Sequence, residues 1–301
     1  MNNEIKGTIF AITAAIISGF SIPLNKIFVV NLDPTVFTAV RSVIIGIAFF
    51  FIVSYRSKFS YKIFKKVSWK YLISIAIIGG SFAFLLFFSG LKLTTAGRGA
   101  LLQKTLPLYV TVLAFLFLKE KISRKYLYAM LLMFIGTLAI YFTQINITEL
   151  WSNPSLGDVL VISATFLWAV ENIIARKAMI KGESNFIVSF ARMFFGGLIL
   201  FGFVVLFGKF DLILSLSVQQ MTNILISTLI LFGYVLFWYW SIKIINVSKA
   251  SSFLLLSPAI SLLVGTLFLG EPAPLIQIIG SMLILIGAYY LSNIKSESSY
   301  A

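Results

Sequence analysis

The sequence of 301 residues contains no cysteine and no histidine. These absences exclude disulfide bonds, thiolate metal sites and catalysis by a cysteine or histidine side chain. Charged residues are also scarce, at 11% of the chain, whereas a soluble domain carries about 25%. Any ionisable chemistry must therefore use Asp, Glu, Lys, Arg or Tyr. We expect no cofactor and no metal.

Apolar side chains are abundant instead, because 59% of the residues are hydrophobic and the mean hydropathy is +1.01. Most lie in runs of about 20 residues, long enough to cross a hydrocarbon layer of roughly 30 Å as helices. The first run exceeds a signal-peptide core, so we expect it to be retained. The sequence predicts an all-α membrane protein with ten transmembrane helices, hereafter spans 1 to 10, at residues 7–30, 34–54, 71–93, 97–118, 126–144, 158–180, 186–208, 222–244, 250–269 and 274–292.

The net charge of +14 comes mainly from bases in short linkers between the apolar runs. The longest basic linker, residues 55–70, holds six lysines and arginines and no acid, whereas the linkers 31–33, 145–157 and 270–273 hold no base. Basic linkers face the cytoplasm in multi-pass proteins. We therefore expect both termini to be cytoplasmic, in a multi-pass protein of the cell membrane. Binding to nucleic acid is not expected.

An internal repeat appears when the chain is laid on itself at a shift of 151 residues. The residues in register are of types that are rare in this chain: Arg41 and Arg192, Gly46 and Gly197, Lys92 and Lys243, Pro107 and Pro258, Glu120 and Glu271, Gly136 and Gly287. This register predicts two five-helix repeats, 1–150 and 151–301. Because each has an odd number of spans, the second is inverted, and inverted repeats are typical of transporters.

The ends of spans 4 and 9 carry the most distinctive segments, PLYVTVLAFLFLKEKIS from Pro107 and PAISLLVGTLFLGEP from Pro258. IGTLAIY at 135–141 and IGAYYLS at 286–292 follow them in spans 5 and 10. They resemble the EamA-type family of the drug/metabolite transporter superfamily, and the similarity extends over roughly residues 7–292. The resemblance implies ten helices and a central cavity lined mostly by spans 1, 3, 4, 6, 8 and 9. Spans 5 and 10 would lie at the periphery or at a homodimer contact.

Glu171 is the only acid well inside an apolar span, where a charge without a partner costs roughly 3 kcal/mol or more. It is a candidate to bind a substrate ammonium group, or to bind a proton and couple transport to a gradient. The structural alternative is an ion pair with Lys104 or Lys26. Asn172 is adjacent in the chain, and Trp168 lies on the same helix face as Glu171. We expect both to contact substrate.

Lys104 and the adjacent Gln103 lie in span 4, which the resemblance places at the cavity. A fixed ammonium group there would attract a carboxylate or a phosphate. Tyr234 and Trp238 in span 8 would provide flat apolar walls with polar tips. Asn25, near the outer end of span 1, completes the expected substrate-binding set.

Further residues are candidates for structural or gating roles. Arg41 and Arg192 correspond in the repeat, which favours a brace between helices in each half. Pro107 and Pro258 are expected to bend their spans, because proline removes a helix hydrogen bond. Lys26, next to Asn25, is a candidate for a gate at the rim.

These observations favour a secondary transporter that works by alternating access and exports amino acids or similar small polar metabolites, with proton coupling as one mode. No ATP-binding P-loop is present in the sequence. The alternative cargo is an anionic or phosphorylated metabolite, and the two differ in whether several bases converge on one cavity. A lipid scramblase or a membrane scaffold is the non-transport alternative. An enzyme is not expected, because Glu171 has no second acid, His or Cys to act with.

Overall fold

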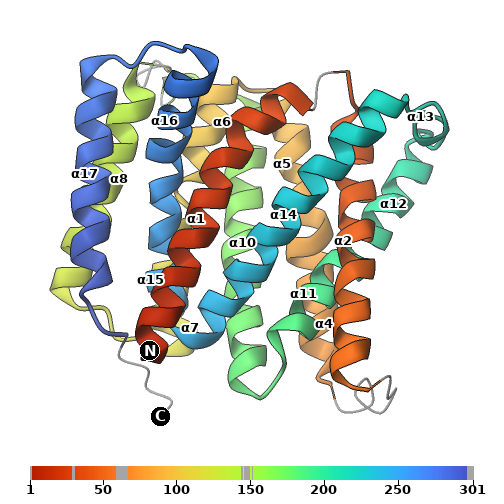
Figure 1. The fold of residues 1–301 in the computed structure, drawn as a ribbon, viewed down its shortest axis with the longest axis horizontal. Helices are drawn as coiled ribbons and strands as arrows, with labels where there is room; N and C mark the ends of the chain where they lie inside the picture. The colour runs from red at the N-terminus through yellow and green to blue at the C-terminus, as the bar shows by residue number, and fades with distance from the viewer. Residues whose placement is uncertain are drawn as a thin grey trace.

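The computed structural model describes residues 2–28, 31–58, 67–143, 145, 150 and 152–296, without the side chains of residues 22 and 25–27. Within these ranges, ten helices are long and apolar enough to cross a membrane. They form one bundle (Figure 1). The start of the first helix and the end of the last helix lie at the same end of the bundle, hereafter the terminal side; the other end is the opposite side. The predicted all-α, ten-helix membrane architecture is confirmed.

The first five spans match the predicted runs to within a few residues. They are α1 (Asn3–Phe28), α2 (Pro34–Arg56), α4 (Trp69–Ile77) continued by the π-helical turn η1 (Ile78–Phe82) and α5 (Ala83–Leu91), α6 (Ala96–Gln103) with α7 (Leu106–Leu118), and α8 (Arg124–Phe142). Span 1 begins four residues earlier than predicted, at Asn3, because the polar lead before residue 7 is already helical.

The second five spans follow the same order. They are α10 (Leu156–Ile180), α11 (Asn185–Phe190) continued by the π-helical turn η2 (Ala191–Phe195) and α12 (Gly196–Leu206), α14 (Val218–Ile244), α15 (Val247–Phe253) with the 3₁₀ turn η3 (Leu254–Leu256) and α16 (Ser257–Leu269), and α17 (Leu275–Ser292). The short helix α13 (Asp211–Leu214) lies between α12 and α14.

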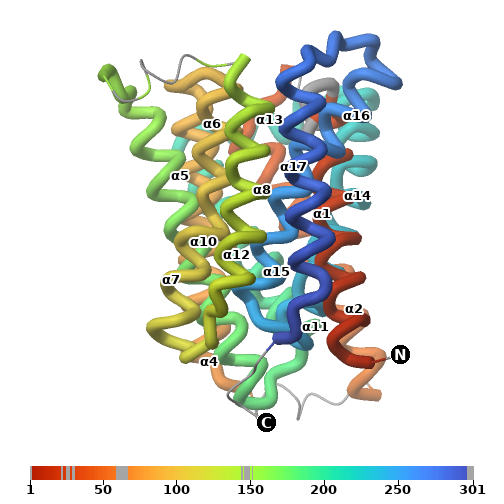
Figure 2. The backbone as a smooth tube through the Cα atoms, turned by 90° about the vertical axis from the view of Figure 1, so that its left-hand side faces the viewer, coloured from red at the N-terminus to blue at the C-terminus, as the bar shows by residue number. Residues whose placement is uncertain are grey.

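Helix packing repeats when the two halves are exchanged. α1 packs on α14 and α16, as its counterpart α10 packs on α5 and α7. Two pairs of counterparts also pack on each other, α2 on α12 and α8 on α17, and the second pair forms one edge of the bundle (Figure 2). α1 starts on the terminal side and α10 on the opposite side. The two halves are inverted repeats that share one bundle; the limits 1–150 and 151–301 remain a prediction.

Polar residues that interrupt the apolar runs cap the helices. Asp33 accepts hydrogen bonds from the N–H groups of the first turn of α2. Ser155 and Asp158 form a reciprocal capping box at the start of α10, as Ser217 and Gln220 do at the start of α14. Such caps satisfy N–H groups that have no partner inside the helix.

The two mid-span prolines begin new helices, which corrects the expectation that they bend continuous ones. α6 ends at Gln103 and α7 begins at Leu106, so Pro107 lies in a first turn, where its missing N–H costs no hydrogen bond. Pro258 has the same place in α16, after the 3₁₀ turn η3. Spans 4 and 9 are therefore broken near the middle of the bundle.

The π-helical turns η1 and η2 pack against each other at the same depth. A Cβ atom on Gly80 would lie 2.3 Å from the carbonyl oxygen of Arg192, and one on Gly79 would lie 2.2 Å from Cγ of Glu171. Glycine is required at both positions because backbone and side chains of spans 6 and 7 occupy that space.

We expect Gly80→Ala to lower the free energy of unfolding by about 1–3 kcal/mol, because the added methyl group meets backbone that cannot move aside. The matched control is Gly202→Ala in α12, where nothing lies within 4 Å of the new Cβ. Thermal melting of both variants in detergent measures the difference. Equal melting temperatures for the two variants would contradict the close packing of spans 3 and 7.

Candidate substrate cavity

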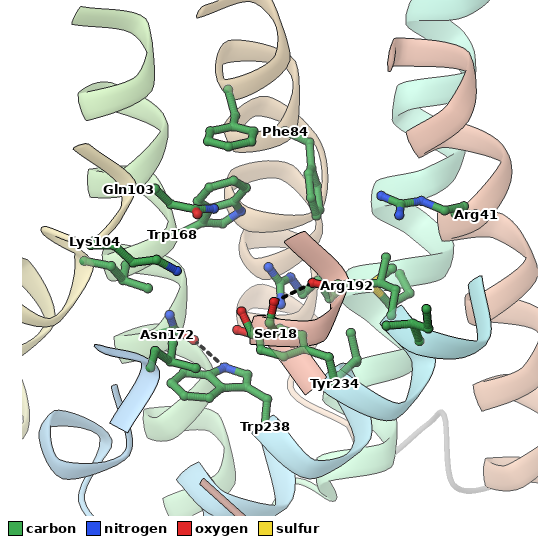
Figure 3. A pocket seen from close by; sticks show the side chains of 18 of the residues that line it. Ser18, Arg41, Phe84, Gln103, Lys104, Trp168, Asn172, Arg192, Tyr234 and Trp238 are labelled. Atoms are coloured by element: carbon green, nitrogen blue, oxygen red, sulfur yellow. Dashed lines mark hydrogen bonds between the residues drawn. The ribbon is translucent and has the colours of Figure 1, made fainter. Parts of the chain in front are cut away.

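A cavity of about 210 Å³ lies among spans 1, 2, 3, 4, 6, 7, 8 and 9 (Figure 3). Its polar lining residues are Ser18, Ser21, Arg41, Gln103, Lys104, Asn172, Arg192, Ser227 and Tyr234. Its aromatic lining residues are Phe84, Phe87, Phe88, Trp168, Trp238 and the same Tyr234. No lining residue comes from α8 or α17, so these two helices lie away from the cavity, as the family resemblance implied; spans 2 and 7 join the expected lining.

Most of the candidate substrate-binding residues meet at this cavity: Gln103, Lys104, Trp168, Asn172, Tyr234 and Trp238. Glu171, the remaining described candidate for substrate binding, does not line the cavity. Of the candidate structural residues, Arg41, Arg192 and Pro107 also line it, whereas Pro258 does not. The side chains of Asn25 and Lys26 lie outside the described residues. A role in binding stays a prediction for each residue.

The cavity lies where the two repeats meet, so counterparts face it from both halves. These pairs are Ser21 and Asn172, Arg41 and Arg192, Phe84 and Val235, and Phe87 and Trp238. The break in span 4 contributes Gln103 and Lys104, whereas their counterparts at the break in span 9 are Leu254 and Leu255. Lys104 is thus a cation that only one half supplies.

Lys104 caps the end of α6, and only 6% of its surface is exposed. Its Nζ donates a hydrogen bond to Oγ of Ser257 at 2.7 Å. No acidic side chain among the described residues pairs with it. An ammonium group buried in this way lacks the charge compensation that a membrane interior demands.

Arg41 is the second cation of the cavity. Its Nη1 donates to Oγ of Ser227 on α14 at 2.7 Å, and its guanidinium lies 4.0 Å from the ring centre of Phe37. Its Nε has no hydrogen-bond partner among the described residues. Arg41 therefore links α2 to α14 and still presents a donor that is not satisfied.

Glu171 lies behind the cavity wall, fully buried. Tyr239 donates its hydroxyl to Oε1 at 2.5 Å, and Nε of Arg192 lies 3.9 Å from Oε2. Among the described side chains the ion-pair partner is thus Arg192 and not Lys104, one of the two lysines that the structural alternative assumed; the side chain of the other, Lys26, lies outside the described residues. The 3.9 Å separation is a charge pair without a hydrogen bond. Because Glu171 compensates Arg192, the remaining charge at the cavity comes from Arg41 and Lys104.

Two indole rings form opposite parts of the cavity wall. Trp168 donates its Nε1 to the carbonyl oxygen of Gly79 at 3.2 Å, and Trp238 donates to Oδ1 of Asn172 at 2.9 Å. The Tyr234 ring stacks on Trp238 with 6.2 Å between ring centres. Since the indole N–H groups are satisfied by the protein, the rings are held in place and offer their faces to a ligand.

The cavity serines were missed by the sequence analysis. Ser18, Ser21 and Ser227 lie in apolar spans, where a hydroxyl usually bonds to its own helix, as Ser21 does to the carbonyl oxygen of Ser18 at 2.8 Å. One signal was present for Ser21, because the repeat register pairs it with Asn172. The others carry no sequence feature that separates them from serines facing lipid.

The two ends of the bundle differ in the contacts made by two counterpart glutamates, Glu120 after span 4 and Glu271 after span 9. On the terminal side, Glu120 is buried and accepts hydrogen bonds from the N–H groups of Val247 at 2.9 Å and Ser248 at 3.2 Å. It thereby joins the end of α7 to the start of α15. On the opposite side its counterpart Glu271 is exposed, and its carboxylate lies against Gly265 of its own helix.

Left-handed residues place both glutamates directly after their helices. Lys119 has a φ of 54° and its counterpart Gly270 a φ of 66°. The N–H groups that follow return to the last turn, from Glu120 to Ala114 and from Glu271 to Gly265. Lysine tolerates this backbone less well than glycine.

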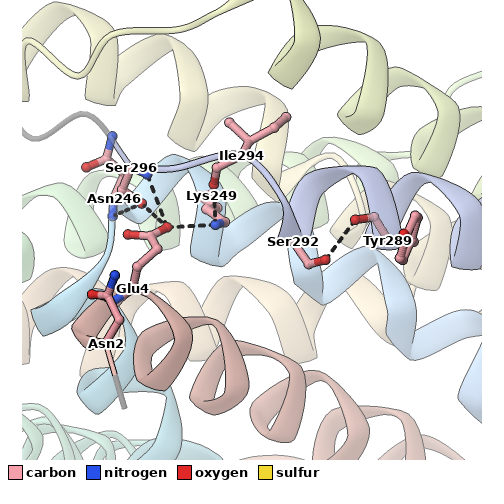
Figure 4. Close-up of polar contacts among 8 residues, drawn as sticks. All are labelled: Asn2, Glu4, Asn246, Lys249, Tyr289, Ser292, Ile294 and Ser296. Atoms are coloured by element: carbon pink, nitrogen blue, oxygen red, sulfur yellow. Dashed lines mark hydrogen bonds and ion pairs between the residues drawn. The ribbon is translucent and has the colours of Figure 1, made fainter.

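An ion pair holds neighbouring helices at each end, and the bases of the two pairs, Arg98 and Lys249, are counterparts in the repeat, whereas the acids are not. Arg98 and Asp158 lie 2.6 Å apart on the opposite side, and Lys249 and Glu4 lie 2.7 Å apart on the terminal side. Glu4 also accepts hydrogen bonds from Ser296, which ties the start of α1 to the chain after α17 (Figure 4). Since both pairs are formed together, they join helices that stay packed, such as α1 with α15.

Asp33 also forms ion pairs on the opposite side, with Lys209 at 2.8 Å and with Lys92 at 3.5 Å. Burial alone would raise the pKa of its carboxyl group. The charge and hydrogen bond of Lys209 and the N–H groups of Val36 and Thr35 together lower the pKa by more than burial raises it, so the pKa lies below its ordinary value. Its stabilising contribution is therefore present at neutral pH and lost as the pH falls through this lowered pKa.

Ten membrane-spanning helices in two inverted repeats around a polar central cavity are the architecture of a membrane transporter. The chain matches the EamA-like transporter family twice, over residues 5–142 and 155–293, once in each half. The protein belongs to this family and is a transporter, not an enzyme.

Several relatives share most of the chain. The "Uncharacterized transporter YyaM" of Bacillus subtilis is 29% identical over 77% of this chain and 76% of its own length. The "Uncharacterized transporter YoaV" of the same organism is 24% identical over 92% and 94%. An "Uncharacterized transporter" of Methanothermobacter thermautotrophicus is 25% identical over 95% and 85%. One solved crystal structure shares the fold, with a TM-score of 0.77 at 16% identity over 95% of this chain and 98% of that one.

We expect Glu171→Gln to destabilise the protein by about 3–5 kcal/mol, because it leaves Arg192 buried without a counter-charge. Adding Arg192→Gln in a double variant should recover part of that loss. Glu271→Gln, which removes an exposed carboxylate, is the matched control. Denaturant titration in detergent micelles gives the coupling energy. Purely additive single effects would contradict a charge pair between spans 6 and 7.

Proposed function

We propose that the protein is a secondary transporter of small organic anions that carry a carboxylate or phosphate group. The observation that carries this proposal is the convergence of Arg41, Lys104 and Arg192 on one cavity while the only acid nearby, Glu171, lies behind the wall. One negative charge set against three positive charges favours an anionic cargo, because an anion supplies the missing compensation.

Convergence of bases is the feature that separates the two cargo classes of the sequence analysis, and it favours the anionic alternative over an amino acid. No carboxylate is found among the described lining residues to hold a substrate ammonium group. Ligand pockets commonly measure about 300–1,000 Å³, so a cavity of about 210 Å³ suits a small metabolite. This size and the enclosed charge argue against a scramblase or a scaffold.

In the proton-coupled mode, Glu171 binds the proton, and Arg192 links the protonation of Glu171 to the binding of the substrate. A proton on Glu171 would remove the counter-charge of Arg192 and strengthen the attraction of Arg192 for an anion in the cavity. Substrate and proton would then be bound together and released together. Because the two would move in the same direction, export, which remains the predicted direction, would be driven by the gradient of the substrate and not by the inward proton gradient.

We expect small carboxylates or phosphorylated compounds to raise the melting temperature of the detergent-purified protein, because a ligand of the folded state stabilises it. Arg41→Gln and Lys104→Gln should each weaken that ligand at least tenfold, a change of about 1.4 kcal/mol. Lys125→Gln, on the exposed start of α8, is the control with the same loss of charge. Stabilisation only by amines or by zwitterionic amino acids would refute the anion proposal.

The difference between the two ends supports alternating access. α7 packs closely on α15 at the terminal side, whereas their counterparts α16 and α6 pack less closely among the described residues. We infer that the structure is closed on the terminal side. Exchange of the two arrangements between the repeats would release Glu120 and let Glu271 cap the start of α6, at Ala96 and Gly97.

The terminal side is the cytoplasmic side in this proposal. The described bases at the end of α2 and the start of α4 (Arg56, Lys58 and Lys70) and the bases that follow α7 lie at this end of the bundle, which fits the orientation rule for cell membranes. The structure is then the outward-facing state, and the cavity exchanges its cargo with the exterior.

The absence of cysteine allows a direct test by labelling with a membrane-impermeant thiol reagent. Ser18→Cys, in the cavity lining, should react from outside intact cells. Adding Glu120→Ala should remove the terminal-side closure, reduce that labelling and increase labelling in inverted vesicles at least tenfold. Adding Glu271→Ala instead should not open the terminal side. Labelling of Ser18→Cys from the cytoplasmic side alone would refute the assigned orientation.

A further inference from the structure

A second cavity of about 650 Å³ opens on the terminal side, between the start of α1, the end of α2, the start of α11 and the end of α14. It shares no lining residue with the central cavity. Three of its lining residues are basic, namely Lys6, Arg56 and Lys243, and no acid is found among its described lining residues.

The three bases have no acidic partner among the described residues. This distinguishes them from Lys249 on the same side, which pairs with Glu4. Arg56 instead lies over the ring of Phe186, 4.9 Å from its centre. Three uncompensated cations from three helices create a concave surface of positive potential, which attracts anions.

Asn185 adds a polar group aimed at the same space. Only 4% of its surface is exposed, it lines the cavity, and its side-chain amide makes no hydrogen bond among the described residues. The amide is not one of the fully enclosed groups that lack a partner, so it meets the space of the cavity. An oxygen atom of a bound anion would satisfy its N–H₂ group.

The remaining wall is aromatic. The rings of Phe10 and Trp240 lie 5.5 Å apart, and those of Phe186 and Trp240 lie 5.9 Å apart, all beside the bases. Cations next to apolar rings at the end of membrane helices suit a phosphate group joined to hydrocarbon. Basic pockets between membrane helices at the cytoplasmic surface recognise lipid head groups in this way.

We propose that this cavity binds a phosphate group, supplied by the head group of an anionic phospholipid in the leaflet on the terminal side. The phosphate contacts Lys6, Arg56, Lys243 and Asn185, and the glycerol region lies on the aromatic wall. The lipid bridges α1 and α14 to α2 and α11, and so stabilises the contact between these helices at the closed end. This site is independent of the proposed cargo.

The test measures lipid binding to the detergent-purified full chain by native mass spectrometry and by thermal stabilisation. Phosphatidylglycerol should bind and raise the melting temperature, whereas phosphatidylcholine should do neither. The double variant Lys6→Gln/Lys243→Gln should weaken phosphatidylglycerol at least tenfold, and Asn185→Leu should weaken it as well. Lys125→Gln/Lys295→Gln removes the same charge from exposed positions on the same side, and should stay within twofold of the parent.

Equal losses in the two double variants, or equal binding of both lipids, would overturn the proposal. Inorganic phosphate distinguishes the source of the group. One outcome is that phosphate alone stabilises the protein and displaces the lipid, with the same dependence on Lys6 and Lys243. That result would mean that the site takes phosphate from solution. It would refute the lipid as the source of the phosphate group and uphold the phosphate chemistry of the site. Because Lys6 and Lys243 are exposed, their variants should melt like the parent without lipid.

Discussion

The lack of water inside a bilayer governs this structure, because every backbone polar group in the membrane needs a partner within the protein. Uninterrupted helices meet that demand, and most spans are of this kind. The exceptions are the breaks after Gln103 and before Ser257 and the π-helical turns η1 and η2. All four lie around the central cavity, where residues of each break and of η2 form the lining and η1 packs behind it. Within the described spans, irregular backbone is thus confined to the surroundings of the cavity.

The same scarcity of water determines how charges are arranged. Glu171 and Arg192 compensate each other, and Tyr239 supplies a hydrogen bond to the carboxylate. Arg41 and Lys104 receive only hydroxyl partners from neighbouring spans. Two cations are therefore held at the cavity at a cost that the proposed anionic cargo would offset. In the proposed exchange between the inverted repeats, the contact made by Glu120 at one end would be replaced by one from Glu271 at the other.

Much of the fold could be predicted because its signals are local. Span length and composition, the basic linkers and the repeat register each follow from residues read along the chain. The prolines were located correctly, but their effect was not, because a proline in a first turn and one in a bent helix look the same in sequence. The candidate residues at the cavity were recovered where a polar or aromatic side chain interrupts an apolar run, and the serines were missed because hydroxyls are common in such runs.

The sequence by itself determined the membrane, the number of spans, the repeats and the family, since these depend on composition and periodicity. Only the tertiary structure decided which charges meet. Glu171 and Arg192 are 21 positions apart in the chain, and no spacing rule pairs them. Nor does any spacing rule bring Arg41, Lys104 and Arg192 to one cavity, because these bases come from three different spans. Helix rotation and packing select the partner of each buried charge, and that choice turns the expected cargo from an amino acid toward an anion.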